Sequence, residues 1–195
     1  MMRRRVVITG IGAITPIGNG ADGLWDGVLA DQSAVRLIDR FDASAFPSRI
    51  AAQIPDFDAA AHLDARRARR LDRFSALSVA AARMAVDDAG IALRDGVATR
   101  TGVWIGSALG GVAYGEEQHE RYVTRGAHGV SPTLALAVFG GAGASNVALD
   151  LGLTGPSVGN ALSSSLSSPN GTSTFVAQLA SSRRRPSTDT PVLAI

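Results

Sequence analysis

The stretch from Asp72 to Gly90, DRFSALSVAAARMAVDDAG, constrains the fold more than any other part of the sequence. Phe74, Leu77 and Ala81 begin an apolar series that recurs at the spacing of one helix face. Gly90 follows this series and is a typical residue at the end of a helix. The pattern therefore predicts a helix over residues 72–89.

Short apolar segments that predict strands lie on both sides of this helix. RVVIT, residues 5–9, is a β-branched run that ends in glycine, and residues 10–20 then predict a turn-rich loop. TGVWIGSALGG, residues 101–111, predicts a central strand that runs into a glycine loop. TGPSVGNA, residues 154–161, predicts a turn into another strand. RIAAQI, within a connection over residues 39–58, is a possible edge strand.

Three further segments predict helices. Residues 20–32 carry an apolar stripe that runs into a polar end, and EEQHERYV, residues 116–123, predicts a short polar helix. Residues 133–151 are rich in alanine and glycine, so we expect one helix there that packs closely on its neighbours. The resulting order, β-α-α-β-α-β, predicts an α/β fold built in layers.

Composition narrows the class of protein. With 195 residues, of which 46% are hydrophobic and 18% charged, the chain fits one globular domain or part of a larger one. The sequence has no cysteine, which excludes disulfides, thiolate metal sites and a cysteine nucleophile. The formal net charge is only +2, and arginine runs such as residues 65–70 are typical of solvated faces, so no nucleic-acid partner is expected.

The N-terminus and the apolar segments do not predict a membrane protein. Residues 1–18 have a basic head and an apolar stretch, but Gly10, Gly12, Pro16 and Gly18 interrupt it. No window reaches about 18 apolar residues, so no membrane contact is expected. We expect a cytoplasmic chain.

The composition changes abruptly after Ala161. Residues 162–195 are dominated by serine, threonine and proline, which is typical of a linker or tail. We therefore expect one domain over residues 1–161 and a divergent, disordered tail over residues 162–195.

Patterns for a cofactor or metal site are incomplete. Gly10 and Gly12 begin a dinucleotide-binding fingerprint, but the position that needs the third small residue is Thr15, followed by Pro16. His119 lies among glutamates, yet no metal-ligand spacing surrounds it. We predict no cofactor and no metal. The serines of residues 163–165 are candidate nucleophiles without a G-x-S-x-G elbow, so composition alone favours a flexible segment there.

Five segments taken together resemble the N-terminal half of the β-ketoacyl-acyl carrier protein synthases. They are RRVVITGIGAITPIGNG, LWDGVLADQSAVRLIDRFDASAFPSRIAAQI, RRLDRFSALSVAAARMAVDDAGI, GVWIGSALGG and VSPTLALAVFGGAGASNVALDLGLTGPSVGNA. The resemblance covers residues 1–161. It implies the thiolase-like layered αβαβα fold, here its N-terminal half only. It also implies a condensing enzyme that elongates acyl chains by decarboxylative condensation of malonyl-carrier protein in fatty acid or polyketide synthesis.

The resemblance assigns two residues and several partners. Counting from Gly155 places Ser164 at the position of the family's nucleophilic cysteine, and Leu109 where the family lines its acyl pocket. The implied partners are acyl carrier protein, malonyl-carrier protein and a second copy in a homodimer, or an intact synthase in a mixed dimer. The family's two catalytic histidines belong to a C-terminal half that this sequence does not contain.

Three explanations fit a serine at this position. The chain is a truncated or frame-shifted product, an excised half, or a degenerate homologue kept as a partner subunit. The abrupt change of composition inside the family's nucleophile motif favours the first. Because a serine hydroxyl without a base is hard to activate, we expect no activity from the chain as written.

Overall fold

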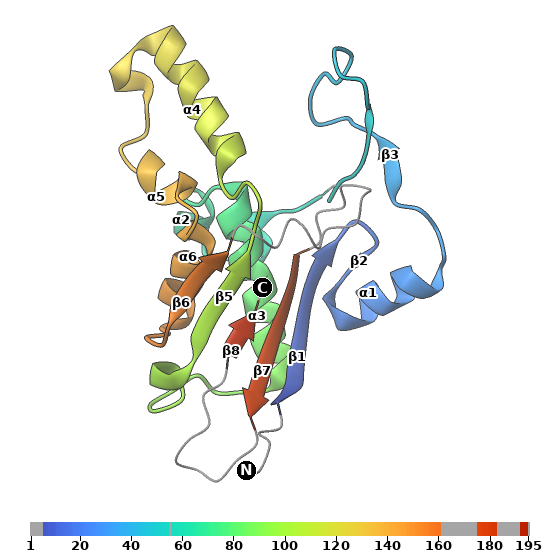
Figure 1. Ribbon diagram of the computed structural model, residues 1–195, viewed down its shortest axis with the longest axis vertical. Helices are drawn as coiled ribbons and strands as arrows, with labels where there is room; N and C mark the ends of the chain where they lie inside the picture. Colours follow the sequence, from blue (N-terminus) through green and yellow to red (C-terminus); the bar gives the residue numbers. More distant parts are fainter. Residues whose placement is uncertain (1–5, 55, 161–174, 183–191, 195) are drawn as a thin grey trace.

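The computed structural model describes residues 6–54, 56–160, 175–182 and 192–194. These residues build a mixed sheet with helices packed on one face, beside a small two-stranded sheet (Figure 1). No helix in these ranges is long and apolar enough to cross a membrane.

The main sheet has the strand order β2-β1-β7-β8-β5-β6. Its strands are β1 (Val6–Thr15), β2 (Gly18–Asn19), β5 (Gly102–Gly106), β6 (Ser157–Asn160), β7 (Phe175–Ser182) and β8 (Val192–Ala194). β5 is parallel to β6 and β8, whereas β7 is antiparallel to β1 and β8. The second sheet pairs β3 (Val35–Leu37) with β4 (Ile50–Ala52), which confirms the edge strand expected in residues 39–58.

The helices are α1 (Gly20–Leu29), α2 (Ala65–Ala68), α3 (Arg73–Ala89), α4 (Val112–Arg125), α5 (Leu134–Val138) and α6 (Ala142–Leu151). Short 3-10 turns cover Ala59–Ala61, Ala98–Arg100 and Ala127–Gly129. α3 packs on β1 and β7, and its neighbour α6 packs on β5 and β6. α4 and α5 project beyond one end of the sheet (Figure 1).

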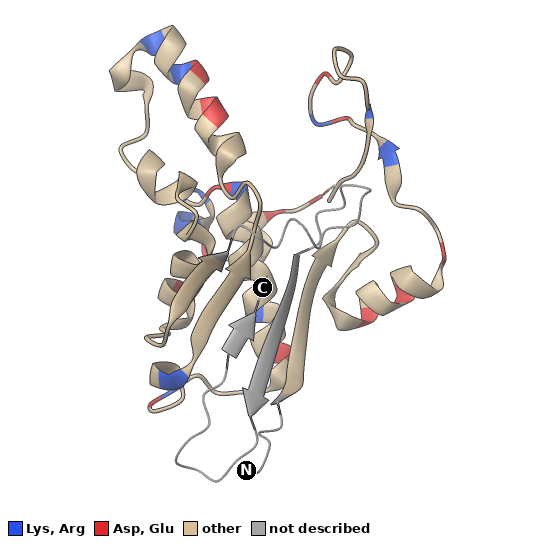
Figure 2. Ribbon diagram, viewed as in Figure 1, with Lys and Arg blue, Asp and Glu red and all other residues tan. Residues whose placement is uncertain are grey.

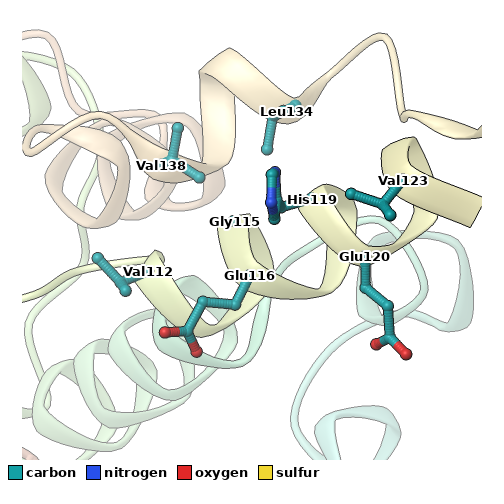
Figure 3. Close-up of a pocket in the computed structure, with 8 residues that line it drawn as sticks. All are labelled: Val112, Gly115, Glu116, His119, Glu120, Val123, Leu134 and Val138. Atoms are coloured by element: carbon teal, nitrogen blue, oxygen red, sulfur yellow. The ribbon is translucent and has the colours of Figure 1, made fainter. Parts of the chain in front are cut away.

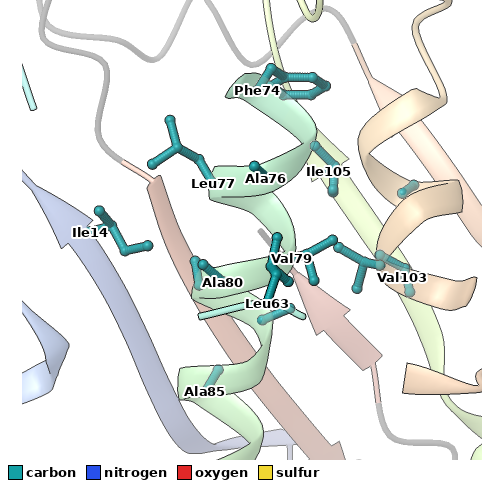
Figure 4. Close-up of a cluster of buried hydrophobic side chains, with 14 of the residues drawn as sticks. Ile14, Leu63, Phe74, Ala76, Leu77, Val79, Ala80, Ala85, Val103 and Ile105 are labelled. Atoms are coloured by element: carbon teal, nitrogen blue, oxygen red, sulfur yellow. The ribbon is translucent and has the colours of Figure 1, made fainter. Parts of the chain in front are cut away.

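The predicted helix over residues 72–89 is confirmed, because all its signals are local. Asp72 lies at its N-cap, where one carboxylate oxygen accepts the N–H groups of Phe74 (3.0 Å) and Ser75 (3.4 Å). Gly90 ends it in the left-handed conformation, with φ +61°. Its buried face meets side chains of the sheet and of α6, among them Ile14 and Val103 (Figure 4).

Two expectations for the secondary structure were wrong. Residues 10–15 belong to β1 and not to a loop, because the small residues of α3 pack directly on the glycines of this strand. The single helix expected over residues 133–151 is two helices, since Phe139 at the end of α5 has an extended conformation with ψ 148°. The sequence places Gly140 and Gly141 in this break.

One face of the sheet is covered and the other is open where side chains are described. Val103 and Ile105 of β5 are buried under the helices, whereas Trp104 between them is 43% exposed on the opposite face. Ile8 of β1 is also exposed. This alternation is that of a strand with one buried face.

Part of the expected tail is built into the sheet. β7 and β8 come from residues 175–182 and 192–194, while residues 161–174 and 183–191 lie outside the described part. The domain boundary at Ala161 and the disorder expected after it stay predictions.

Candidate functional site

An apolar cavity of about 660 Å³, largely open to solvent, lies between α4 and α5. Figure 3 shows Val112, His119 and Val123 on the side of α4 toward α5, while the carboxylates of Glu116 and Glu120 point away. The remaining lining residues are Gly115, Leu134 and Val138. His119 therefore contributes to a mainly apolar wall. No group of three potential metal ligands occurs among the described residues.

The glycine loop after β5 leads into α4, whose first residue, Val112, lines this cavity. Ser107 Oγ accepts the N–H of Gly110 at 2.9 Å, and Gly110 adopts φ +52°, so the loop turns tightly. A Cβ on Gly111 would lie 2.3 Å from the carbonyl oxygen of Ala137, so the loop packs directly on the backbone of α5. This close contact fixes the distance between the end of β5 and α5.

Leu109 lies at the tip of this loop and is 71% exposed. Its carbonyl oxygen accepts the N–H of Val112 at 3.2 Å, and Val112 lines the cavity. Leu109 itself lines neither of the two hollows described for this part of the chain. Its role in an acyl pocket stays a prediction.

A second, more polar groove of about 1160 Å³ lies between α2 and the α5–α6 pair. Its basic wall is the arginine cluster, defined here as Arg66, Arg67, Arg69 and Arg70, and its opposite wall includes apolar groups of α5 and α6. Figure 2 shows the basic residues of α2 beside α6. The full lining is Asp64, the arginine cluster, Leu71, Asp72, Tyr114, Ser131, Thr133, Leu136, Ala137, Asn146 and Leu149.

Local hydrogen bonds form α2, the helix that carries the first two arginines of the cluster. Asp64 caps α2 by accepting the N–H groups of Arg66 (3.1 Å) and Arg67 (3.0 Å) with one carboxylate oxygen. Arg66 and Arg67 both lie in the last turn, where cations interact favourably with the helix dipole. The helix start at Asp64 is therefore present in the sequence, although residues 65–70 were interpreted only as a solvated charged run.

Asp150 of α6 holds two arginines from different helices. Its carboxylate accepts two hydrogen bonds from Arg83 of α3, at 2.7 and 2.9 Å, and lies 3.2 Å from Arg67 of α2. The Asp150 side chain is only 1% exposed. The hydrogen bond to Asp150 raises the pKa of Arg83 above its ordinary value, although partial burial acts in the opposite direction. Arg83 also donates to the carbonyl of His62 at 2.7 Å.

Hydrogen bonds also join α6 to the start of α3. The amide of Asn146 donates to Ser75 Oγ at 3.3 Å and to the carbonyl of Ala142 at 2.9 Å.

Arg73, the first residue of α3, contacts an aromatic ring. Its guanidinium carbon lies 5.4 Å from the ring centroid of Phe57, which also stacks on His62. Burial, with a smaller contribution from Arg40, lowers the pKa of Arg73.

Two further candidate residues, Ser164 and His128, are not part of this groove as the structure describes it. Ser164 lies outside the described residues, so its predicted place at the nucleophile position stays a prediction. His128 lies in the exposed 3-10 turn after α4. Sequence reasoning missed the role of the arginine cluster and of Asp150. The available signal was Asp64 before the arginine run, which predicts a helix start.

The architecture around this groove defines a class of protein. Solved structures with the same arrangement include the ishigamide ketosynthase/chain length factor, with a TM-score of 0.71 and 31% identity over 80% of this chain and 40% of that chain. A β-ketoacyl synthase from Burkholderia phymatum STM815 has a TM-score of 0.65 and 30% identity over 78% of this chain and 38% of that one. The fold is thus the thiolase-like α/β fold of ketosynthases, as the resemblance predicted.

Sequence comparison gives the family. The model of "Beta-ketoacyl synthase, N-terminal domain" matches residues 3–180, so the chain belongs to the β-ketoacyl synthase family. A 3-oxoacyl-[acyl-carrier-protein] synthase 2 from Coxiella burnetii is 38% identical over 158 residues, which are 81% of this chain and 38% of the relative. The enzyme of the same name from Staphylococcus aureus is 37% identical over 78% of this chain and 37% of its own length. The chain therefore spans less than two fifths of these relatives.

Proposed function

We propose that this chain supplies the N-terminal part of a condensing enzyme that elongates acyl chains on a carrier protein. In this reaction the acyl group leaves its thioester and bonds to the α-carbon of a malonyl thioester, which loses CO₂. The observation that carries the proposal is the family match over residues 3–180 together with the ketosynthase fold. The matched relatives include a 3-oxoacyl-[acyl-carrier-protein] synthase and a type II polyketide ketosynthase in complex with its acyl-carrier protein, so a carrier protein appears in the name of both.

The arginine cluster supports a carrier protein as the partner. Carrier proteins present their acyl group on a phosphodiester-linked arm, and arginine is well suited to phosphate and carboxylate groups. Only Arg67 of the cluster has an ion pair in the described part of the chain, so three guanidinium groups are available to a partner. One structural relative, with a TM-score of 0.63, comes from the complex of a type II polyketide acyl-carrier protein with its ketosynthase.

The apolar cavity supports an acyl chain as the bound group. Its volume of about 660 Å³ lies in the range of small-molecule sites, and its walls are mainly aliphatic. Leu109 is joined to this wall through its hydrogen bond with Val112. We propose that an acyl chain passes Leu109 on its way to the cavity.

The serine at position 164 supports the proposal that this chain does not catalyse the condensation by itself. The resemblance puts the acyl-accepting thiol at this position, and a serine hydroxyl is far less acidic than a thiol. A second candidate function follows from the same residue. A non-catalytic subunit that dimerises with an intact synthase needs no nucleophile, and one structural relative joins a ketosynthase to a chain length factor.

Binding to a carrier protein tests the main proposal. We expect fluorescence anisotropy to show that a labelled bacterial acyl carrier protein, with its phosphopantetheine arm, binds the chain in low salt and leaves as salt rises. A triple variant, Arg66→Ala with Arg69→Ala and Arg70→Ala, should lose this binding. No binding by the unaltered chain would reject the carrier partnership.

Mixed assembly tests the second candidate. The chain is mixed with an intact 3-oxoacyl-carrier-protein synthase, and native mass spectrometry measures the complexes formed. A one-to-one mixed dimer that keeps the activity of the intact subunit supports the partner role. Separate species at micromolar concentration reject it.

A further inference from the structure

Asp150 is a buried carboxylate that joins three helices. Arg83 of α3 donates two hydrogen bonds to it, at 2.7 and 2.9 Å, and Arg67 of α2 lies 3.2 Å from the same group. Asp150 itself lies near the end of α6. One side chain that is 1% exposed therefore fixes α2, α3 and α6 to one another.

α2 needs a contact of this kind because it is a single turn. It spans only Ala65–Ala68, and a helix of this length is unstable without tertiary contacts. Its cap, Asp64, is local and does not tie it to another element. Ala68 packs against the hydrophobic core, and Arg67 adds the polar ties, through Asp150 and through a 3.4 Å hydrogen bond to the carbonyl of Asn146.

The four arginines of the cluster therefore have two different roles. Arg67 is 30% exposed and is bound to α6, whereas Arg66, Arg69 and Arg70 are exposed and have no ion pair among the described residues. All four line the same groove. The contact made by Arg67 thus joins the segment that carries the other three guanidinium groups to α6.

We propose that Asp150 is a positioning residue for carrier binding: it holds α2 through Arg67, while Arg83 holds Asp150, so that the three unpaired arginines face the docking carrier. This inference rests on the proposed function. Asp150 itself touches no partner, because its side chain is buried. Its effect on binding acts through the conformation of α2.

Charge and conformation predict opposite effects of neutralising Asp150. Asp150→Asn removes one negative charge from a chain of net charge +2, so long-range attraction to the phosphate-bearing carrier should increase. The same change leaves Arg67 and Arg83 without their carboxylate and loosens α2. If α2 then holds its binding conformation about a fifth of the time, the affinity falls about fivefold.

Anisotropy with the same labelled acyl carrier protein measures this effect. We expect Asp150→Asn to bind roughly fivefold more weakly than the unaltered chain. The matched control is Asp95→Asn, which makes the same charge change at an exposed position whose φ of 50° suits asparagine. We expect the control to bind as tightly as the unaltered chain or slightly more tightly.

A second pair of variants decides the matter if Asp150→Asn does not fold. Arg67→Gln leaves the Asp150–Arg83 pair in place, and Arg66→Gln makes the same charge change on the same helix without breaking a described contact. We expect faster amide hydrogen exchange at Ala68 and Leu71, whose N–H groups donate to the carbonyls of Asp64 and Arg67, only in Arg67→Gln. We also expect Arg67→Gln to bind the carrier more weakly than Arg94→Gln, which makes the same charge change at an exposed position outside the arginine cluster.

The outcomes separate the two proposals. If the unaltered chain binds carrier and Asp150→Asn binds as tightly or more tightly, the positioning role is overturned and the proposed function stands. If α2 exchanges equally in Arg67→Gln and Arg66→Gln, the positioning role is overturned by a measurement that needs no carrier. Absence of carrier binding by the unaltered chain overturns the proposed partnership and, with it, this inference.

Discussion

Gly12 of β1 and Ala81 of α3 approach so closely that no side chain fits between them. A Cβ built on Gly12 would lie 2.0 Å from the carbonyl oxygen of Ala81 and 2.5 Å from the amide nitrogen of Ala85. Gly10, two residues earlier on the same face, meets the backbone at Ala85 and Ala89 in the same way. The strand thus packs on helix backbone and not on side chains.

We therefore predict that Gly12→Ala strongly destabilises the chain. The new methyl group meets backbone atoms that cannot rotate away, so α3 must shift from the sheet, at a cost of roughly 3 kcal/mol. Chemical denaturation followed by circular dichroism measures this change in the free energy of unfolding. Gly96→Ala is the control, because nothing lies within 4 Å of a Cβ there. Equal stability of the two variants would contradict the close packing.

These glycines also show where sequence reasoning reached its limit. The helix over residues 72–89 could be predicted because its cap, apolar stripe and stop all lie within the helix or directly beside it. Gly10 and Gly12 were assigned to a loop by local preference, whereas a distant helix rich in alanine keeps them in a strand. Long-range packing overrides local propensity at such positions.

The candidate site shows the same contrast between local sequence signals and long-range contacts. The arginine run was visible in the sequence, but its contact with Asp150 links residues far apart in the chain. No periodicity or motif places Arg67, Arg83 and Asp150 together. The family resemblance predicted the fold, while the groove with its free and bound arginines required the three-dimensional arrangement.

The N-cap of α3 gives a second prediction. Asp72 is 6% exposed and accepts two N–H groups of the first turn, so Asp72→Ala should reduce the free energy of unfolding by about 1 kcal/mol. Asp72→Asn keeps a side-chain oxygen at the cap and should lose less. Thermal denaturation of both variants measures the difference. Asparagine and alanine variants of equal stability would show that the cap contributes little.

A third prediction concerns acyl transfer. We expect no covalent acyl adduct when the purified chain is incubated with an acyl-carrier thioester, because a serine hydroxyl is far less acidic than the thiol that the resemblance places at position 164. Intact-protein mass spectrometry measures the adduct, with Ser164→Ala as the control. A stable adduct that maps to Ser164 and disappears in the control, together with condensation product, would contradict this expectation.

The last prediction is that the chain, in the absence of carrier, self-associates through the apolar wall of α5 and α6. Leu136 of α5 is 65% exposed and Leu149 of α6 is 74% exposed, and both line the same groove. Phe139, in the break between the two helices, is 44% exposed. Exposed apolar groups that gather on one surface favour association, since contact removes them from water.

Two substitutions at this wall should reverse the association. We expect multi-angle light scattering at micromolar concentration to give a mass above that of one 20.0 kDa chain, and the double variant Leu136→Glu with Leu149→Glu to lower it. Leu29→Glu is the control, because Leu29 is 64% exposed on α1, away from this groove. A cooperatively unfolding monomer from the unaltered chain would contradict the prediction. An equal drop in mass from the control would also contradict the prediction, because the effect would then follow from added charge and not from this wall.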